Sequence, residues 1–151
     1  MPTHFQRLSA LERIFNGLIN VLVRIGLAPG YAYQLEVRGR KSGKLYTAPV
    51  FVLDRERHRY LVAPRGETQW ARNAQATGQV TLRRGAKATA FDVKLVPQAE
   101  RAPLLADYLG RHAGSVQRFF SVPKDAPVEA FTAIADRHPV FELLPREQPR
   151  G

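Results

Sequence analysis

The chain has 151 residues, of which 44% are hydrophobic and 24% charged, the ordinary composition of a folded domain of this length. It contains no cysteine, which excludes disulfides, thiolate metal ligands and a cysteine nucleophile. The formal net charge is +10, and residues 36–94 carry +8 of it, with 13 Lys+Arg against 5 Asp+Glu. Such a basic segment attracts anions: a phosphorylated cofactor, an acidic tail, nucleic acid or anionic lipid.

Residues 5–27 have the apolar periodicity of an amphipathic helix, with Leu11, Phe15 and Leu18 at three- and four-residue steps. LAPG at 27–30 ends this pattern. Two interpretations stay open for the helix: packing on its own domain, or peripheral membrane contact, since it also carries three arginines. No signal peptide or spanning segment of ~20 apolar residues is visible. We therefore expect a cytoplasmic protein, with membrane association as the alternative.

The middle of the chain has the pattern of β-strands. Five runs have the length and composition of strands: YQLEV (33–37), PVFVL (49–53), YLVA (60–63), VTLRR (80–84) and TAFDVKLV (89–96). The first and last alternate apolar and polar residues, as half-buried strands do. The second and third are continuous apolar runs, which indicates that both of their faces are covered. The fourth run pairs with the fifth across a turn near Gly85.

One segment interrupts these strands, and helices follow them. Residues 67–77 suit a short inserted helix, with Thr68 as N-cap and Gly78 as its stop. Two further helices are expected, at 99–112 and at 126–138, the second capped by Asp125. A last strand and a loose polar end complete the chain, at residues 140–144 and 146–151.

The whole chain, 1–151, is therefore expected to be one domain of the α+β class, mainly antiparallel β. We predict a small barrel of about six strands with flanking helices. Its expected parts are an N-terminal amphipathic helix (1–30), barrel strands with the inserted helix (31–98), C-terminal helices with the last strand (99–145), and the tail (146–151).

No catalytic apparatus of the protein's own is visible. The four histidines are scattered without metal-ligand spacing, and no nucleophile elbow, Walker motif or carboxylate pair is present. We expect no metal site, and a cofactor to carry the chemistry of any reaction. The catalytic residues stay unassigned, with Tyr31, Tyr33 and Tyr108 as candidates for a proton donor.

The turn GRKSG at 39–43 suits an anionic ligand. Gly39 and Gly43 let the backbone turn sharply and approach a ligand. Ser42 offers a hydroxyl, and free backbone N–H groups of such a turn can point at oxygens. The positive charge comes from Arg40, Lys41 and Lys44.

A second group of residues, APRGETQWARN at 63–73, follows a buried strand. A strand end, a glycine, a helix N-terminus and an aromatic plane together could hold a flat ring. Trp70 could flank that ring or pack in the core. Asn73 could bond to the edge of the ring or brace a loop.

Taken together, the two stretches resemble the deazaflavin-dependent nitroreductase family of split β-barrel proteins. The matching patterns are G-R-K-S-G-x-x-x-x-x-P-V and R-G-x-T-x-W-x-R-N-x-x-A-x-G, in this order across residues 35–96, and RHPVFEL near the end is also similar. The resemblance implies a split β-barrel that binds the deazaflavin coenzyme F-420. This coenzyme has a flat ring, a phosphodiester and a polyglutamate tail.

The resemblance also implies roles for individual residues. The anionic tail and phosphate would meet Arg40, Lys41, Ser42 and Gly43. Pro49 and Val50 would lie under the ring. The edge that binds the ring would comprise Ala63, Arg65, Gly66, Trp70 and Asn73. Lys44 and Tyr46, at the end of the basic turn, complete the predicted cofactor-binding set.

The function implied is an oxidoreductase that passes hydride from reduced F-420 to a small electron acceptor, such as a quinone or a nitroaromatic. Flavin mononucleotide (FMN) is the alternative coenzyme, because relatives of this barrel bind FMN, heme or fatty acid. The alternative function is non-enzymatic binding of a lipid, a fatty acid or the cofactor. A homodimer is possible by this resemblance, although nothing in the residues alone requires one. Nucleic acid is not expected as a partner, because Phe51 and Tyr60 lie in buried runs.

Overall fold

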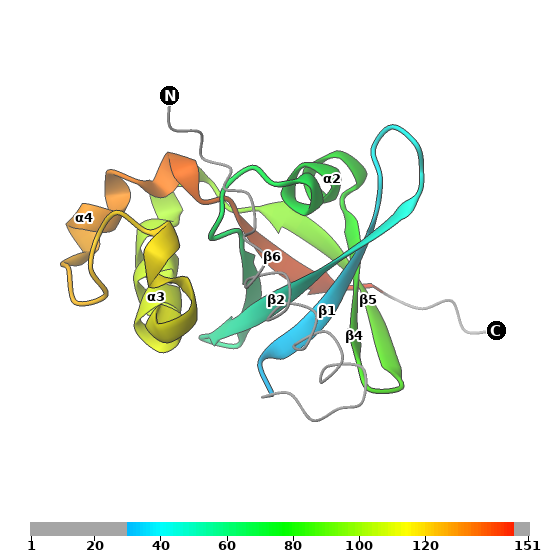
Figure 1. Cartoon of the computed structure of the whole chain (residues 1–151), viewed down its shortest axis with the longest axis horizontal. Helices are drawn as coiled ribbons and strands as arrows, with labels where there is room; N and C mark the ends of the chain where they lie inside the picture. The colour runs from blue at the N-terminus through cyan, green and yellow to red at the C-terminus, as the bar shows by residue number, and fades with distance from the viewer. Residues whose placement is uncertain (1–29, 147–151) are drawn as a thin grey trace.

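The computed structural model describes residues 30–146, which form a closed barrel of six antiparallel strands (Figure 1). The strands are β1 (Ala32–Arg38), β2 (Leu45–Arg55), β3 (His58–Val62), β4 (Gln79–Arg84), β5 (Lys87–Leu95) and β6 (Val140–Pro145). Their order is β1-β2-β3-β6-β5-β4, and β4 pairs back with β1. The predicted α+β barrel of about six strands is confirmed. The expected N-terminal helix and residues 147–151 of the tail lie outside the described residues.

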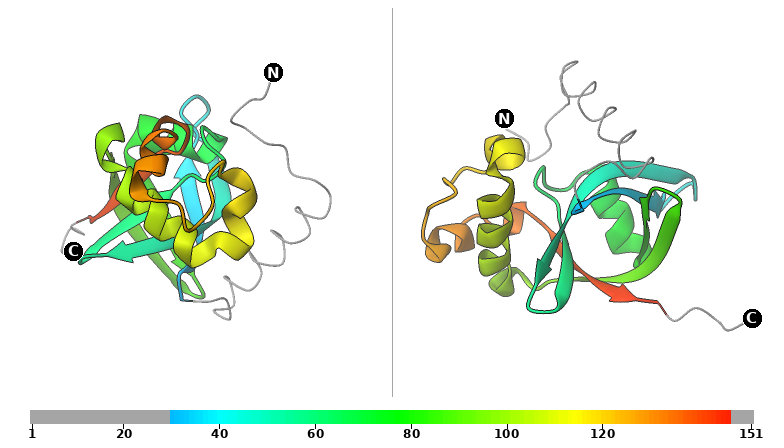
Figure 2. Two further views of the ribbon diagram at one scale, coloured as in Figure 1. Left: turned by 90° about the vertical axis from the view of Figure 1, so that its left-hand side faces the viewer. Right: turned by 90° about the horizontal axis from the view of Figure 1, so that it is seen from below.

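Three α-helices accompany the strands in the described part: α2 (Gln69–Thr77), α3 (Ala102–Val116) and α4 (Val128–Thr132). Short 3-10 turns lie at Gln98–Glu100, Gln117–Phe119 and Ala135–Arg137. Figure 2 shows α3 and α4 together at one side of the barrel, with α2 apart from them.

The second C-terminal helix is shorter than expected. The prediction of one helix over 126–138 is wrong, because α4 ends at Thr132. Beyond it the hydrogen bonds are of the tighter 3-10 type: Ile134 N–H donates to the Phe131 carbonyl, and Arg137 N–H donates to the Ile134 carbonyl. Its N-cap is Pro127 and not Asp125. His138 leaves the helical region because Pro139 follows it.

The apolar residues of the strands form two separate cores. Inside the barrel, Val50 and Val52 of β2 pack with residues such as Leu35 and Leu82. Outside it, Leu53 of the same strand packs under α3 and α4. Since successive side chains of a strand point to opposite faces, β2 needs apolar residues on both. The inference that both faces of this continuous apolar run are covered is therefore confirmed.

Helix α2 closes one end of the barrel. Its Ala71 and Ala74 are fully buried and belong to the interior core. Thr68 and Gly78 bound it as predicted, and Gly78 stops it with φ 71°. In Figure 1, α2 lies at the upper end of the barrel beside the β1–β2 turn, whereas the β4–β5 turn lies at the lower end.

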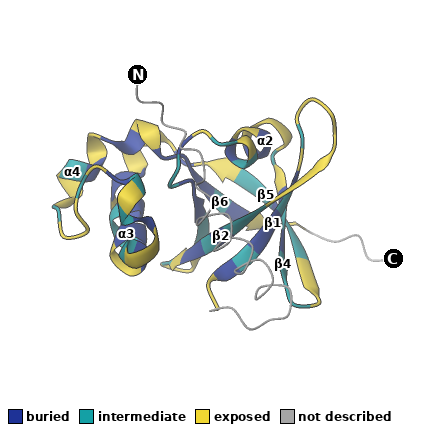
Figure 3. Ribbon diagram, in the orientation of Figure 1, coloured by how far each residue is buried: buried dark blue, intermediate teal, exposed yellow. Residues whose placement is uncertain are grey.

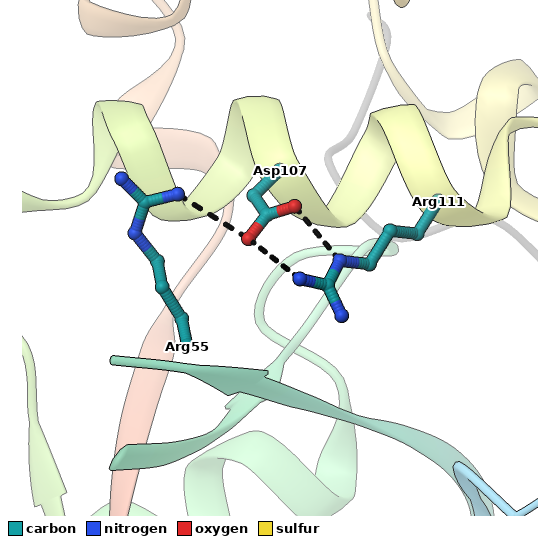
Figure 4. Close-up of polar contacts among 3 residues, drawn as sticks. All are labelled: Arg55, Asp107 and Arg111. Carbon is teal, nitrogen blue, oxygen red and sulfur yellow. Dashed lines mark hydrogen bonds and ion pairs between the residues drawn. The ribbon is translucent and has the colours of Figure 1, made fainter. Parts of the chain in front are cut away.

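Helix α3 is tied to the β2–β3 hairpin by a carboxylate that serves two arginines (Figure 4). Asp107 accepts from Arg55 Nη1 at 3.3 Å, and from Arg111 Nε, one helical turn further along, at 2.8 Å. The Asp107 side chain is 19% exposed, so this network is better shielded than an ordinary surface ion pair. Among residues 30–146, every helix is too short or too polar to act as a membrane span.

Candidate functional site

The basic turn between β1 and β2 is a compact, projecting loop. Gly39 N–H donates to the Lys44 carbonyl at 2.7 Å, and Gly43 N–H donates to the Gly39 carbonyl at 3.0 Å. Gly43 has φ 72°, a left-handed conformation that favours glycine. Lys44 N–H donates to Ser42 Oγ at 3.2 Å. Residues 40–44 are exposed, and Figure 3 shows this projecting hairpin largely in the colour of exposed residues.

Asn73 of α2 anchors this turn. Its Oδ1 accepts the backbone N–H of Arg40 at 3.0 Å and Arg40 Nη1 at 2.8 Å. The same guanidinium nitrogen donates to Gln69 Oε1 at 3.1 Å. Asn73 is only 1% exposed, so these bonds compensate the burial of its amide oxygen. Of the two interpretations left open by the sequence, these contacts correspond to Asn73 as a brace for a loop.

The remaining groups of the turn face solvent. Lys41 and Lys44 are exposed, and Arg38 Nη1 donates to the Gly43 carbonyl at 3.3 Å. Tyr46 lies over the turn, since a Cβ added to Gly39 would be 2.7 Å from Tyr46 Cε2. Exposed ammonium groups on a glycine-containing turn make a suitable surface for phosphate or carboxylate oxygens.

The loop between β3 and α2, residues 63–68, leads into the N-terminus of α2. Ala63 is 1% exposed, and its N–H donates to the Pro139 carbonyl at 2.9 Å. Gly66 has φ 85°, and its N–H donates to the Ala63 carbonyl at 3.1 Å. Thr68 precedes the helix in an extended conformation, but its hydroxyl makes no capping bond. The Arg65 guanidinium lies 5.5 Å from the ring centroid of Phe119, at a cation–π distance.

The apolar members of the predicted set are placed at different depths. Val50 is 6% exposed and packs inside the barrel, whereas its neighbour Pro49 is half-buried. Trp70 is half-buried at the edge of the interior core, with its ring centroid 5.9 Å from that of Phe141. Helix α2 therefore brings Asn73 to the basic turn and Trp70 to the edge of the interior core, in which Val50 is packed.

The three candidate tyrosines lie elsewhere. Tyr108 is 2% exposed, and burial raises the pKa of its phenol. Tyr33 pairs with Val50 in the sheet and accepts a hydrogen bond from Arg59 at 3.1 Å. Tyr31 is 42% exposed and packs against the rings of Phe51 and His112. Within residues 30–146, no three His, Asp or Glu side chains are arranged to share a metal ion.

The structure adds two residues that the sequence reasoning missed. Gln69 holds the Arg40 guanidinium together with Asn73, and its position four residues before Asn73 on a helix was a usable signal. Phe119 contacts both Arg65 and Arg118 through its ring face, from a 3-10 turn that follows α3. Nothing in the local sequence connects Phe119 with the loop at Arg65.

Comparison with known proteins gives one family. The family model described as F-420H2-dependent quinone reductase matches residues 16–129, well over half of the chain. The match includes the basic turn, the β3–α2 loop and the whole of α2. A search among curated proteins found no significant match.

Solved structures share the fold. A structure described as a domain-swapped dimer has 17% sequence identity and a TM-score of 0.52, covering 88% of this chain and 92% of its own. The heme storage protein HutZ of Vibrio cholerae has 11% identity and a TM-score of 0.54, with 80% and 84% covered. A pyridoxamine 5'-phosphate oxidase-like protein of Listeria innocua has 11% identity and a TM-score of 0.52, with 86% and 94% covered. At these identities the likeness concerns the barrel alone.

Proposed function

Because this chain belongs to the F-420H2-dependent quinone reductase family, we propose that it binds reduced coenzyme F-420 and reduces a small organic acceptor, a quinone or a nitroaromatic. One observation carries the proposal for the site: Arg40 and Asn73 are bonded at 2.8 Å, so the two motifs of the sequence form one continuous surface.

The residues of this surface fit the anionic part of the coenzyme. Lys41 and Lys44 are exposed, and Arg40 is fixed by α2 with a further face open to solvent. At Gly43 an added Cβ would meet nothing within 4 Å, so a ligand has room to approach the backbone there. Phosphate and carboxylate oxygens are the ligands that such cations prefer.

The ring would lie on the other side of the α2 N-terminus. Gly66 and Trp70 would flank the ring, and Arg65, whose guanidinium lies against the Phe119 ring, would border it. Ala63 and Val50 are buried, so they would contribute to the floor beneath the ring and not to its side walls. We propose that Trp70 both packs on the core and flanks the ring, because its side chain is only half-buried and packs against the interior core.

When bound, the reduced coenzyme would supply the hydride that the acceptor receives. The protein's own contribution is position. Asn73 and Gln69 hold Arg40 and thereby the turn, and the turn would hold the anionic arm. Fixing the arm also fixes the ring relative to the acceptor. The entropy cost of aligning the two is then met on binding and not in the hydride-transfer step. FMN, with a single phosphate, would use fewer of these cations.

Tryptophan fluorescence tests this proposal directly, because Trp70 is the only tryptophan of the chain. The full-length protein is titrated with F-420 and with FMN in parallel, and oxidation of F-420H2 is then followed with a quinone and a nitroaromatic acceptor. We expect saturable quenching by F-420 below about millimolar concentration and turnover with at least one acceptor. Saturation by FMN alone would assign FMN as the coenzyme in place of F-420. No response to either compound would favour the lipid-binding alternative.

We also propose that the protein forms a homodimer. Leu45 and Tyr46, 48% and 42% exposed, place large apolar side chains on the projecting hairpin, and a structure with the same barrel is described as a domain-swapped dimer. Light scattering during size-exclusion chromatography gives the mass. Leu45→Ser, which lies outside the predicted cofactor set, should weaken a dimer formed through this hairpin.

A further inference from the structure

A hollow opens at the end of the barrel opposite α2, beside the β4–β5 turn. Its volume is about 340 Å³, and four strands supply its walls. Leu82 and Phe91 form an apolar floor that is continuous with the interior core, and Arg59, Arg84, Lys87 and Tyr33 stand around the opening. This volume is at the lower end of the roughly 300–1,000 Å³ found for ligand pockets, which suits a compact molecule.

The alternation of the strands explains why cations gather here. On β4, Val80, Leu82 and Arg84 face the barrel interior, and Val80 and Leu82 lie in its core. On β5, Phe91 faces the same way and Lys87 follows the same parity. The interior positions are therefore apolar in the middle of the barrel and cationic at its rim. Arg83, by contrast, points outward and pairs with Glu36 at 3.3 Å.

Two of these cations are held in place by the protein. Arg84 Nη1 donates to the Ala32 carbonyl at 2.9 Å. Arg59 donates through Nη2 to the Tyr33 hydroxyl at 3.1 Å and through Nε to Asp54 Oδ1 at 3.1 Å. The Arg59 guanidinium also lies 5.9 Å from the centroid of the Phe91 ring. A guanidinium that is already ordered loses less entropy when it binds a ligand.

Among the described residues that line the hollow, three are cations and none is a carboxylate. Asp54, which bonds to Arg59, has a side chain 71% exposed and is strongly screened by water. The Tyr33 hydroxyl accepts from Arg59, so its own proton is left to donate elsewhere. An anionic oxygen in the hollow would therefore meet positive charge and hydrogen-bond donors above an apolar floor.

We propose that this end of the barrel is a binding site for a compact organic anion: a carboxylate or a phosphate group carried on a small apolar body. The head group would contact Arg84, Lys87 and the Tyr33 hydroxyl. The apolar body would pack on Leu82 and Phe91. The site is separate from the basic turn, because Tyr33 and Arg38 are at opposite ends of β1, about 17 Å apart at the rise of ~3.4 Å per residue of a strand.

Isothermal titration calorimetry of the full-length protein tests this site with three probes of similar size: phenyl phosphate, benzoate and neutral benzyl alcohol. We expect saturable binding of at least one anion, weakened by added salt, and no binding of the alcohol. The tighter anion identifies the head group that the site prefers. Arg84→Gln and Lys87→Ala should each weaken binding about tenfold, the effect of losing one charge-assisted bond.

Matched variants separate this site from unspecific charge. Arg83→Gln and Lys94→Ala remove a cation from the same two strands on the outward face, and should leave the affinity within about twofold. Lys87 is exposed, so Lys87→Ala keeps the test valid if Arg84→Gln destabilises the barrel. The proposal is overturned if neither anion binds, if the outward variants weaken binding equally, or if binding is lost in Lys41→Ala with Lys44→Ala instead.

Discussion

One amide oxygen, Asn73 Oδ1, accepts both the backbone N–H of Arg40 at 3.0 Å and the Arg40 guanidinium at 2.8 Å. The two residues are 33 positions apart, on an exposed turn and on a helix that closes the barrel. The Arg40 guanidinium is thus tied to the fold, and the exposed Lys41 and Lys44 beside it are the groups best placed to meet a ligand.

Asn73→Ala should loosen this turn. The substitution leaves a backbone N–H and a guanidinium without their common acceptor, and we expect it to lower the free energy of unfolding by about 1–3 kcal/mol. F-420 affinity should fall as well, because the turn loses its fixed position. Chemical denaturation and the fluorescence titration measure the two effects. Gln75→Ala is the control, since Gln75 lies on the exposed side of α2 and its side-chain amide donates to Glu67. Unchanged coenzyme affinity in Asn73→Ala would contradict the role of the turn.

Lys41→Ala combined with Lys44→Ala should weaken F-420 binding by about tenfold at low ionic strength, because two exposed cations near an anionic arm are removed. The dependence of the dissociation constant on salt should become shallower. FMN should be affected less, since it has no polyglutamate tail. The matched control is Lys94→Ala with Lys124→Ala, which removes the same charge from exposed positions outside the turn. An equal loss of affinity in the two double variants would show that net charge, and not the position of the turn lysines, causes the effect.

Gly39→Ala should destabilise the protein by about 1 kcal/mol, because the new Cβ would lie 2.7 Å from Tyr46 Cε2 and 3.1 Å from Ser42 Oγ. Tyr46 is 42% exposed and can move aside, which keeps the cost moderate. In a Tyr46→Ala background the same substitution should cost clearly less, as a double-mutant cycle by thermal denaturation would show.

Gly110→Ala is the contrasting case: it lies in α3 with nothing within 4 Å of the added Cβ, and should stabilise the helix by up to about 1 kcal/mol.

His112 should make the stability depend on pH. Burial lowers the pKa of its imidazole, the neighbouring Arg111 lowers it further, and Asp107 opposes this shift. As the pH falls below about 6.5, this histidine is protonated in the unfolded chain but is still neutral in the folded protein. The free energy of unfolding therefore decreases as the pH falls from about 6.5 through the lower pKa of the folded protein. In His112→Phe, which keeps an aromatic ring among Tyr31, Phe51 and Tyr108, the fall in Tm between pH 7.5 and 5.5 should be smaller. An unchanged slope in His112→Phe would exclude this group as the cause.

Local features of the sequence determined the elements well. The strands begin and end near the predicted runs, except that β2 begins at Leu45, four residues before the predicted run. Gly78 ends α2 because a left-handed C-cap preference is a property of a single residue, and Thr68 precedes the helix as predicted, although its hydroxyl makes no capping bond. The failure at 126–138 is also local in origin: helical periodicity does not say where an α-helix gives way to a 3-10 turn. The pairing of two motifs, each weak alone, was enough to indicate the family that the comparison then gave.

What only the tertiary structure decided concerns residues from different strands and helices. The sequence could not show that β6 inserts between β3 and β5, that Asn73 reaches Arg40, or that Phe119 reaches Arg65. Nor could it bring Tyr33, Arg59, Arg84 and Lys87 to one end of the barrel. The physical reason is that the period of a strand fixes which face a side chain takes, whereas strand order and register fix its neighbours. Those depend on how the whole barrel closes around its core.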